Sequence, residues 1–368
     1  MTTLARAGIR PDRPASEATV AIDLRGVELP DGVRLRRWRG LDADLPAMWA
    51  VADAARVADG EVERTTYDGL ATYYRHLERS DLDRDLVIAE LHGEFAGFAR
   101  VEWHDSNDGE RWYEGVGIID PALRRRRIGA ALLAWTERRR VEIARAQAAA
   151  DPALHERSRW LTTFLFDGNV GGKVLLTAAG YEPFRRFATM RRADLEAIES
   201  HELPAGLEIR PIRRDLAEMR RVFDADAEAF RDHFGWVEAT DESFAEFVED
   251  PDVDPEGWIV AFDGDEIAGG VLNGIHQVPG GAREGWLDSV FVRRPWRRRG
   301  LARALIARSL WLLRERGMST ASLGVDLSNV NQALALYESC GFRAVSSATA
   351  YRKPLPSTGD GPREEAPR

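Results

Sequence analysis

The fold is decided by one stretch of this 368-residue chain, Val290-Phe291-Val292-Arg293-Arg294-Pro295-Trp296-Arg297-Arg298-Arg299-Gly300-Leu301-Ala302. An apolar strand leads into a basic turn, and the turn opens a helix whose apolar residues recur at three- and four-residue spacing until Gly317. The first N–H groups of a helix have no partner inside it, and the helix dipole favours an anion beside them. Gly300 has no Cβ and lets the main chain approach a phosphate. The stretch therefore predicts a strand–turn–helix unit that binds a polyphosphate.

A turn of the form Arg-x-x-Gly-x-Ala is also compatible with a solvated basic helix start. Two other phosphate-binding patterns are absent from the sequence, the Gly-x4-Gly-Lys-Ser/Thr loop and Gly-x-Gly-x-x-Gly after a strand. Nucleic-acid binding through the arginine clusters conflicts with the net charge of −10, because such binding depends on neutralising phosphates.

The chain carries the same pattern of elements twice. Residues 86–101 align with 258–273, residues 116–133 with 289–306, and residues 169–184 with 329–345. Each half also opens with a short strand, at Val33 and at Leu207. Matched blocks in the same order indicate a duplication. Strands that alternate with helices predict an α/β fold in each repeat.

The expected organisation is two repeats with unfolded ends. We predict a disordered tail over 1–30, a first repeat over 31–196, a linker over 197–206, a second repeat over 207–355 and a disordered tail over 356–368. The linker holds a Pro and a Gly that interrupt regular structure. The tails mix Pro, Gly and charge with little apolar surface to bury.

Composition restricts the compartment. No apolar run is long enough to span a bilayer, and the N-terminus lacks a signal-peptide core. The single cysteine, Cys340, excludes an internal disulfide and favours a reducing compartment, so we expect a cytoplasmic protein. Cys340 precedes Gly341-Phe342 at an expected helix end, and we predict that it packs in the core rather than acting as a nucleophile.

The second repeat resembles the GNAT superfamily of N-acetyltransferases. The acyl-CoA site of that family has the pattern Arg/Gln-x-x-Gly-x-Gly/Ala after a bulged strand, which Arg297 to Ala302 matches. Another family element is an Asn followed by a helix that ends Leu-Tyr-x-x-x-Gly-Phe, here Asn329 through Leu336-Tyr337 to Gly341-Phe342. The resemblance covers residues 205 to 355 well and 30 to 195 more loosely. It implies two tandem GNAT-type modules, each a mixed, mostly antiparallel sheet flanked by helices.

The resemblance also implies roles for the matching residues. The main chain of the strand would hold the pantetheine arm and the thioester carbonyl, the turn would bind the pyrophosphate, and the Asn would bond the cofactor. These positions are Val290, Phe291 and Val292 in the strand, Arg297, Arg298, Arg299, Gly300, Leu301, Ala302 and Arg303 in the turn and helix start, and Asn329. Tyr337 would protonate the departing thiolate as general acid, although a core aromatic at a helix end is the alternative.

An ammonium acceptor must lose a proton before it can attack, and in this superfamily an acid on the strand before the turn often takes it. Asp288 lies two residues before Val290 and should share its sheet face, and Glu284 has the same parity and is the reserve. Either acid could instead face solvent without a role in catalysis.

The first repeat departs from the family pattern. Its turn reads Leu123-Arg124-Arg125-Arg126-Arg127-Ile128-Gly129, so Arg127 replaces the central glycine, and Leu176 stands where the second repeat has Tyr337. A register shifted by two, Arg126-x-x-Gly129-x-Ala131, restores the pattern but breaks the alignment. We expect no catalysis in this copy; a structural or substrate-shaping role fits it better, and cofactor binding without turnover stays open.

The predicted function is transfer of an acetyl group from acetyl-CoA to a primary amine of a small molecule, by direct attack in a ternary complex and without a metal. The alternative is a non-catalytic acyl-CoA-binding regulatory or scaffold protein. Neither nucleic acid nor a membrane is an expected partner, and the tandem chain is expected to be a monomeric pseudo-dimer or a homodimer. Tandem repeats with an altered first copy also resemble the mycothiol synthase family, which acetylates a cysteinyl amine.

Overall fold

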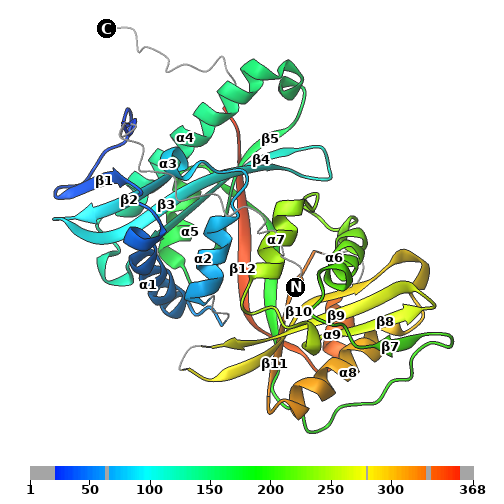
Figure 1. Ribbon diagram of the computed structural model, residues 1–368. Helices are drawn as coiled ribbons and strands as arrows, with labels where there is room; N and C mark the ends of the chain where they lie inside the picture. The colour runs from blue at the N-terminus through cyan, green and yellow to red at the C-terminus, as the bar shows by residue number, and fades with distance from the viewer. Residues whose placement is uncertain (1–20, 63–65, 279–280, 329–332, 357–368) are drawn as a thin grey trace, which may run out of the picture.

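The computed structural model describes residues 21–62, 66–278, 281–328 and 333–356. The fold is α/β: a 12-stranded sheet in the order β1-β2-β3-β4-β5-β12-β6-β11-β10-β9-β8-β7, flanked by helices (Figure 1). Most neighbouring strands are antiparallel, and two pairs, β4 with β5 and β10 with β11, are parallel. The expected sheet type is therefore confirmed.

The two repeats contain the same order of helices and strands, except that a 3-10 turn (Pro255–Gly257) stands in the second repeat where the first has the short helix α3. The first repeat comprises β1 (Val33–Arg37), α1 (Leu41–Asp59), α2 (Tyr67–Arg75), α3 (Leu82–Asp85), β2 (Leu86–Leu91), β3 (Glu94–Asp105), β4 (Arg111–Ile119), α4 (Ile128–Ala150), β5 (Arg159–Phe166), α5 (Val170–Ala178) and β6 (Glu182–Arg192). The second comprises β7 (Glu208–Arg210), α6 (Leu216–Phe230), α7 (Asp241–Glu249), β8 (Ile259–Asp263), β9 (Glu266–Gln277), β10 (Arg283–Val292), α8 (Leu301–Glu315), β11 (Ala321–Asp326), α9 (Ala333–Ser339) and β12 (Arg343–Pro354). A 3-10 turn precedes α4 (Pro121–Leu123) and α8 (Arg294–Trp296) alike.

The repeats exchange their last strands at the centre of the sheet. β12 of the second repeat lies between β5 and β6 of the first, and β6 lies between β12 and β11 of the second. In Figure 1, β12 (red-orange) runs through the junction beside β5. The sheet is thus continuous across the two repeats, and neither half of the sequence supplies its own part of the sheet alone.

Helices cover both faces of the sheet in the second repeat. On one face α8 buries Leu301, Leu305 and Leu310 against Leu287 and Leu323, in a cluster that also holds Cys340 and Tyr337. On the other face α6 packs Met219 and Val222 against Val260 and Phe291. The prediction that Cys340 is a core residue is confirmed, because its side chain belongs to this buried cluster.

Residues 21–30 differ from the expectation of a disordered tail. Ile22, Leu24, Val27 and Leu29 are partly buried against the core of the first repeat, and Asp23 pairs with Arg138 of α4. Apolar residues spaced two or three apart give this segment a side that packs, which composition alone does not reveal. The tails over 1–20 and 357–368 lie outside the described residues.

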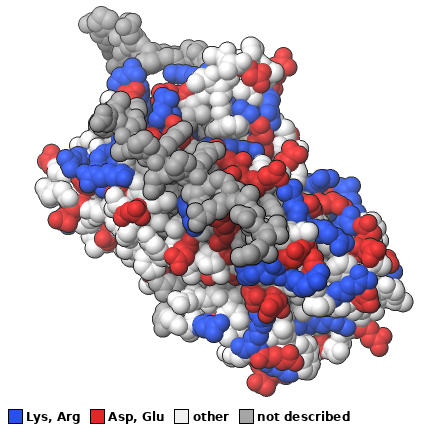
Figure 2. Space-filling model, in the orientation of Figure 1, with Lys and Arg blue, Asp and Glu red and all other residues white. Residues whose placement is uncertain are grey.

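Charged side chains of both signs are interspersed over the face drawn in Figure 2. Many form arginine–carboxylate pairs, for example Arg124 with Asp59 and Arg185 with Asp326. Within the described ranges, no helix is long and apolar enough to cross a membrane.

Candidate active site

β10 parts from its neighbour β11 close to its start. The two strands pair at Gly285 with Ala321 and at Trp286 with Ser322, and no further. β11 then continues along β6, while β10 continues along β9. In the described part of the chain, the other edge of β10 thus has no strand partner over residues 287–292, so alternate main-chain groups are available to a ligand. The predicted pantetheine-binding residues, Val290, Phe291 and Val292, all lie in this open part.

A β-bulge interrupts β10 at Asp288. Leu287 pairs with Asn273 and Ser289 with Leu272, so Asp288 is the extra residue. Leu287 and Val290 consequently both face α8 although they are three residues apart. The prediction that Asp288 shares the face of Val290 is therefore wrong, because the bulge breaks the two-residue alternation. Ser289 faces α6, where its hydroxyl meets Asp226.

The turn between β10 and α8 has the conformation of an anion cradle. Arg298 has φ 60° and Gly300, the N-cap of α8, has φ 85°, both in the left-handed region. Among the described residues, no side chain caps the helix, and a Cβ built on Gly300 meets none of their atoms within 4 Å. The space in front of the first N–H groups of α8 is therefore open, as an incoming phosphate needs.

The arginines of the turn divide into two groups. Arg297 is tied to the protein: its guanidinium donates to the carbonyl oxygens of Val292 (2.9 Å) and Ala229 (2.8 Å) and pairs with Asp232 (3.0 Å). Arg298 and Arg299 are exposed and make no hydrogen bond or ion pair with any described residue, and Arg303 is exposed and donates a hydrogen bond to the hydroxyl of Ser339. Arg297 therefore fixes the shape of the turn, and the other three are the guanidinium groups that a polyphosphate can meet.

Helix α9 places Tyr337 in the buried cluster that also holds Leu287 of β10. Its side chain is 8% exposed and packs near Phe342, and burial raises the pKa of its phenol to about 12. The group is thus protonated throughout the physiological range. Asn329, the other predicted residue of this element, lies outside the described residues. Leu301 is buried and Ala302 half-buried at the start of α8.

The two candidate bases have opposite surroundings. Asp288 is half-exposed and accepts a hydrogen bond from Nε2 of His276 on β9 at 2.8 Å. Glu284 is 1% exposed and forms a bidentate ion pair with Arg191 of β6, at 2.5 and 2.7 Å, and accepts a hydrogen bond from Ser322. Both oxygens of Glu284 are thus occupied, so only Asp288 is available to a substrate.

Sequence reasoning did not place a further acid, Asp226, at the bulge. Asp226 of α6 accepts a hydrogen bond from the hydroxyl of Ser289, and burial raises the pKa of its carboxyl to about 6. The enclosed acids Glu284, Asp44 and Asp85 pair with arginines, whereas no cation of the described residues pairs with Asp226. His276, Ser289 and Arg191 were also missed, because each acts through a contact between elements far apart in sequence.

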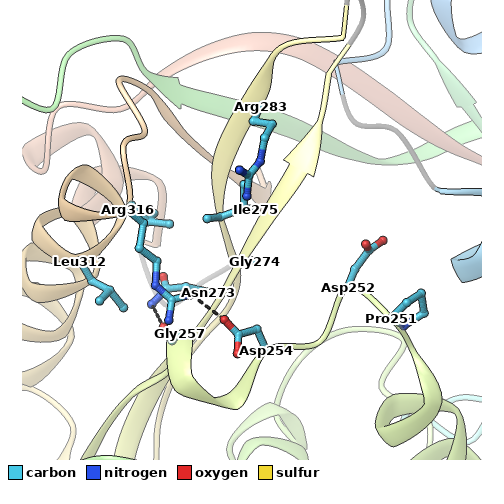
Figure 3. A pocket seen from close by; sticks show the side chains of 11 residues that line it. Pro251, Asp252, Asp254, Gly257, Asn273, Gly274, Ile275, Arg283, Leu312 and Arg316 are labelled. Atoms are coloured by element: carbon cyan, nitrogen blue, oxygen red, sulfur yellow. Dashed lines mark hydrogen bonds and ion pairs between the residues drawn. The ribbon is translucent and has the colours of Figure 1, made fainter.

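A cavity of about 430 Å³ opens along β9 (Figure 3). Its lining mixes polar and apolar residues and comprises Pro251, Asp252, Asp254, Gly257, Asn273, Gly274, Ile275, Arg283, Leu312, Leu313 and Arg316. Arg316 pairs with Asp254 at 2.6 Å, while Oδ1 of the buried Asn273 has no hydrogen-bond partner among the described residues. Gly274 joins the cavity to the bulge, because a Cβ there would lie 2.4 Å from Oδ2 of Asp288.

The first repeat keeps the turn but not the rest of the arrangement. Arg125 and Arg127 have φ 67° and 63°, and Arg127 is the N-cap of α4, as Gly300 is of α8. This geometry excludes the shifted register, since Gly129 lies inside the helix. β4 pairs with β3 without a bulge, and Leu176 is buried in place of a tyrosine.

A buried arginine also distinguishes the first repeat. Arg140 of α4, fully buried, donates to the carbonyl oxygens of Tyr113 on β4 and Thr162 on β5, and to the hydroxyl of Tyr181. Its counterpart, counted from the helix N-cap, is Leu313 of α8. Arg140 therefore ties β4 to β5 near the point where they part.

Known proteins resemble the chain over most of its length. The sequence model of the acetyltransferase (GNAT) family matches residues 50–157 and again residues 218–342. A mycothiol acetyltransferase of Clavibacter michiganensis is 30% identical over 332 residues, which are 89% of this chain and 97% of the relative. A mycothiol acetyltransferase of Thermobispora bispora is 28% identical over 86% of this chain and 98% of the relative.

Solved structures show the same architecture. A GCN5-related N-acetyltransferase from Sphaerobacter thermophilus superposes with a TM-score of 0.66 at 26% identity, over 90% of this chain and 98% of that one. A tandem GNAT protein from the clavulanic acid biosynthesis pathway superposes with a TM-score of 0.62 at 17% identity, over 89% of this chain and 99% of that one. The second likeness shows that the fold is shared.

Proposed function

The chain belongs to the GNAT family of acetyltransferases, and from that premise we propose that its second repeat moves the acetyl group of acetyl-CoA to a primary amine of a small molecule. The observation that carries the proposal is the parting of β10 from β11, followed by the left-handed turn at Gly300. Family membership supports an acetyltransferase with acetyl-CoA as co-substrate. The location in the second repeat and the residue roles are our proposal.

Acetyl-CoA fits the open edge and the turn by their chemistry. The pyrophosphate would meet the free N–H groups at the start of α8 and the exposed guanidinium groups of Arg298, Arg299 and Arg303. The amide groups of the pantetheine arm would pair, as an added strand does, with those main-chain groups of Val290 to Val292 that neither β9 nor Arg297 engages. The open space in front of Gly300 supports this placement.

The proton steps use two side chains on either side of the thioester. Asp288, oriented by His276, would take a proton from the acceptor ammonium and leave the amine free to attack the carbonyl carbon. A main-chain N–H of the open β10 edge would stabilise the developing oxyanion. Tyr337 would then protonate the sulfur as the carbon–sulfur bond breaks, and its raised pKa keeps it in the acid form. Glu284, tied to Arg191, is not proposed as a base.

The acceptor side favours a polar, cationic substrate. Asp288, Asp226 and Asp250 lie around the bulge and the end of α7, where negative charge attracts an ammonium group. The cavity beside Gly274, with polar residues in its lining, can accept a hydroxylated body. The relatives named mycothiol acetyltransferase make a cysteinyl amino sugar the first acceptor to test.

The first repeat is proposed not to catalyse. It lacks the bulge and has Leu176 in place of the tyrosine, which removes the acid. Arg127 places a side chain where Gly300 leaves open space, although the turn itself keeps its conformation.

The test follows free CoA thiol during incubation with acetyl-CoA and a panel of aminoglycosides, amino acids, polyamines and a cysteinyl amino sugar. Tyr337→Phe should lower kcat by at least about 100-fold. Tyr351→Phe removes a hydroxyl from another buried tyrosine, in the core of the first repeat, and should not. Binding of acetyl-CoA without thiol release from any acceptor would favour the non-catalytic acyl-CoA-binding alternative. Absence of acetyl-CoA binding would refute the site.

A further inference from the structure

Residues 231–252 of the second repeat, here called the acceptor cap, lie between that repeat's bulge and the first repeat. The cap comprises the segment after α6, helix α7 and the turn that follows. In Figure 1, α7 faces α2 of the first repeat, and the two helices are neighbours in the structure. Side chains of the first repeat hold the cap at both ends.

At its first end the cap is held by the β3–β4 turn and by β4. Nδ2 of Asn107 donates to the carbonyl oxygens of Arg231 (2.9 Å) and His233 (2.8 Å). The ring of Phe234 lies 5.0 Å from the ring of Trp112, and Gly235, at φ 70°, leaves so little room that a Cβ would come within 3.3 Å of Trp112. An exposed loop of the second repeat is thereby anchored on the sheet of the first.

The aromatic residues of this loop are engaged by protein rather than open to a substrate. Phe234 also packs against Phe184 of β6 at 5.9 Å, and the guanidinium of Arg185 lies 3.9 Å above its ring. The loop is therefore packed against the first repeat in a defined position.

At its second end the cap is held by α2 and the residues that flank it. Nδ1 of His76 contacts Glu242 at 2.7 Å and its Nε2 contacts Glu249 at 3.0 Å, so the imidazole joins the two ends of α7. Glu78 accepts a hydrogen bond from Thr240 at 2.6 Å. Thr66, the N-cap of α2, donates to Asp252 at 3.1 Å.

The other side of the cap reaches the proposed chemistry. Asp232 pairs with Arg294 and Arg297 of the turn before α8. Burial raises the pKa of Asp250 at the end of α7, and the charges of His276 and Asp288 also act on that carboxyl. The cap is thus the element that connects the first repeat with the acceptor side of the bulge.

We propose that the first repeat acts as a positioning element that holds the acceptor cap over the bulge and so sets the affinity for the acceptor. His76, Asn107 and Trp112 are the positioning residues. The acceptor part of this inference rests on the proposed function, whereas the clamping of the cap does not. A catalytically silent repeat is then needed for substrate binding in the other.

The first arm of the test needs no acceptor. Amide hydrogen exchange of the full chain is compared for wild type, Asn107→Ala and His76→Gln. Exchange should rise within residues 231–252 and stay unchanged in α8 and β10. The matched controls are Asp108→Ala, next to Asn107 in the same turn, and His155→Gln, an exposed histidine with no contact to the cap in the described structure. Equal amide hydrogen exchange of the cap in variants and controls would refute the proposal that the first repeat holds the cap in place.

The second arm measures steady-state kinetics with the best acceptor of the panel. Asn107→Ala and His76→Gln should each raise KM for the acceptor about fivefold, with kcat and KM for acetyl-CoA within about twofold. Trp112→Phe, which keeps a ring against Phe234, should retain more acceptor affinity than Trp112→Ala. An unchanged acceptor KM in a variant whose cap has loosened, or an equal rise in both KM values, would overturn the positioning role. Failure of wild type to turn over any acceptor refutes the proposed function instead, and the exchange arm still decides the clamp.

Discussion

At the scale of single residues, β10 shows how two acids four positions apart acquire different roles. Glu284 and Asp288 are both carboxylates before the phosphate-binding turn, and the sequence ranks them only by distance from Val290. In the structure, Arg191 arrives from β6 and takes both oxygens of Glu284, while the bulge turns Asp288 toward His276. We therefore expect Glu284 to contribute to stability and Asp288 to contribute to catalysis.

Substitution of Glu284 should lower stability, whereas substitution of Asp288 should lower activity. Glu284→Gln leaves the Arg191 guanidinium without its charge partner in a largely enclosed position, so the free energy of unfolding should fall by about 3 kcal/mol. Asp288→Asn should leave that free energy within about 0.5 kcal/mol, because its carboxylate is half-exposed, yet lower kcat/KM about 100-fold or more. Urea unfolding and the thiol assay measure the two quantities. An Asp288→Asn enzyme with full activity would remove this residue from the mechanism.

Asp226 should make stability depend on pH in the direction opposite to an ion-paired acid. Burial raises its pKa from 3.8 to about 6, so the folded state holds the proton more tightly than the unfolded state. The ionised carboxylate therefore lowers the free energy of unfolding. This effect is absent below the pKa that the carboxyl has in the unfolded chain, and it is complete above about pH 6. Asp226→Asn should raise the free energy of unfolding by about 2 kcal/mol at pH 8, after allowance for partial exposure, and by less at pH 5.

Urea unfolding at the two pH values checks this expectation. Asp224→Asn is the matched control, because Asp224 lies on the same helix, is exposed and pairs with Arg220. Equal effects of Asp226→Asn at pH 5 and pH 8 would mean that the carboxyl is not protonated near pH 6.

The residues that the sequence could not identify share one property. Gly300, Tyr337 and Asp288 belong to a local pattern, and such patterns are visible along the chain. His276 and Arg191 contribute through contacts with β10 from β9 and β6. Those partners depend on strand register and on which helix covers which face, so no sequence spacing reveals them.

At the scale of elements, the bulge and the turn carry the site. Alternation along a strand predicts faces correctly only while the register is continuous, and the extra residue at Asp288 reverses it. The turn behaves differently: its conformation is retained in both repeats although Arg127 replaces the glycine. Backbone geometry was therefore conserved by the duplication where the ligand-facing surface was not.

Gly300→Ala tests that distinction. The left-handed φ of 85° costs an L-residue about 1 kcal/mol of stability, and the new Cβ projects into space where no atom of the described residues lies within 4 Å. KM for acetyl-CoA should rise about tenfold or more, while KM for the acceptor changes little.

The first repeat supplies the control for this variant. Arg127→Gly relieves the same backbone strain, at φ 63°, so it should stabilise the chain by up to about 1 kcal/mol and leave the kinetics unchanged. Isothermal titration with CoA and thermal unfolding report the two effects. A Gly300→Ala enzyme with normal affinity for CoA would place the pyrophosphate elsewhere.

At the scale of the whole molecule, the duplication was evident in the sequence but the pairing of its halves was not. The matched blocks predict two similar modules joined by a linker. β6 and β12 are equivalent strands with similar patterns, so each could pair within its own repeat or with the other one. In the structure the two repeats exchange these strands, and β12 lies between β5 and β6. This pairing depends on how the two repeats are placed in space, which the linker alone does not fix.

The exchange predicts that the two halves of the chain depend on each other for folding. A chain cut after Ser200 yields a first half whose β5 has lost β12 and a second half whose β11 has lost β6. Each fragment then exposes a long unpaired strand edge, which favours aggregation over a monomeric fold. We expect neither fragment alone to unfold cooperatively, and we expect the co-expressed fragments to form a one-to-one complex that binds CoA. Cooperative unfolding of an isolated, monomeric second half would show that the exchanged strands are dispensable, and the intact chain, unfolding in a single transition, is the reference.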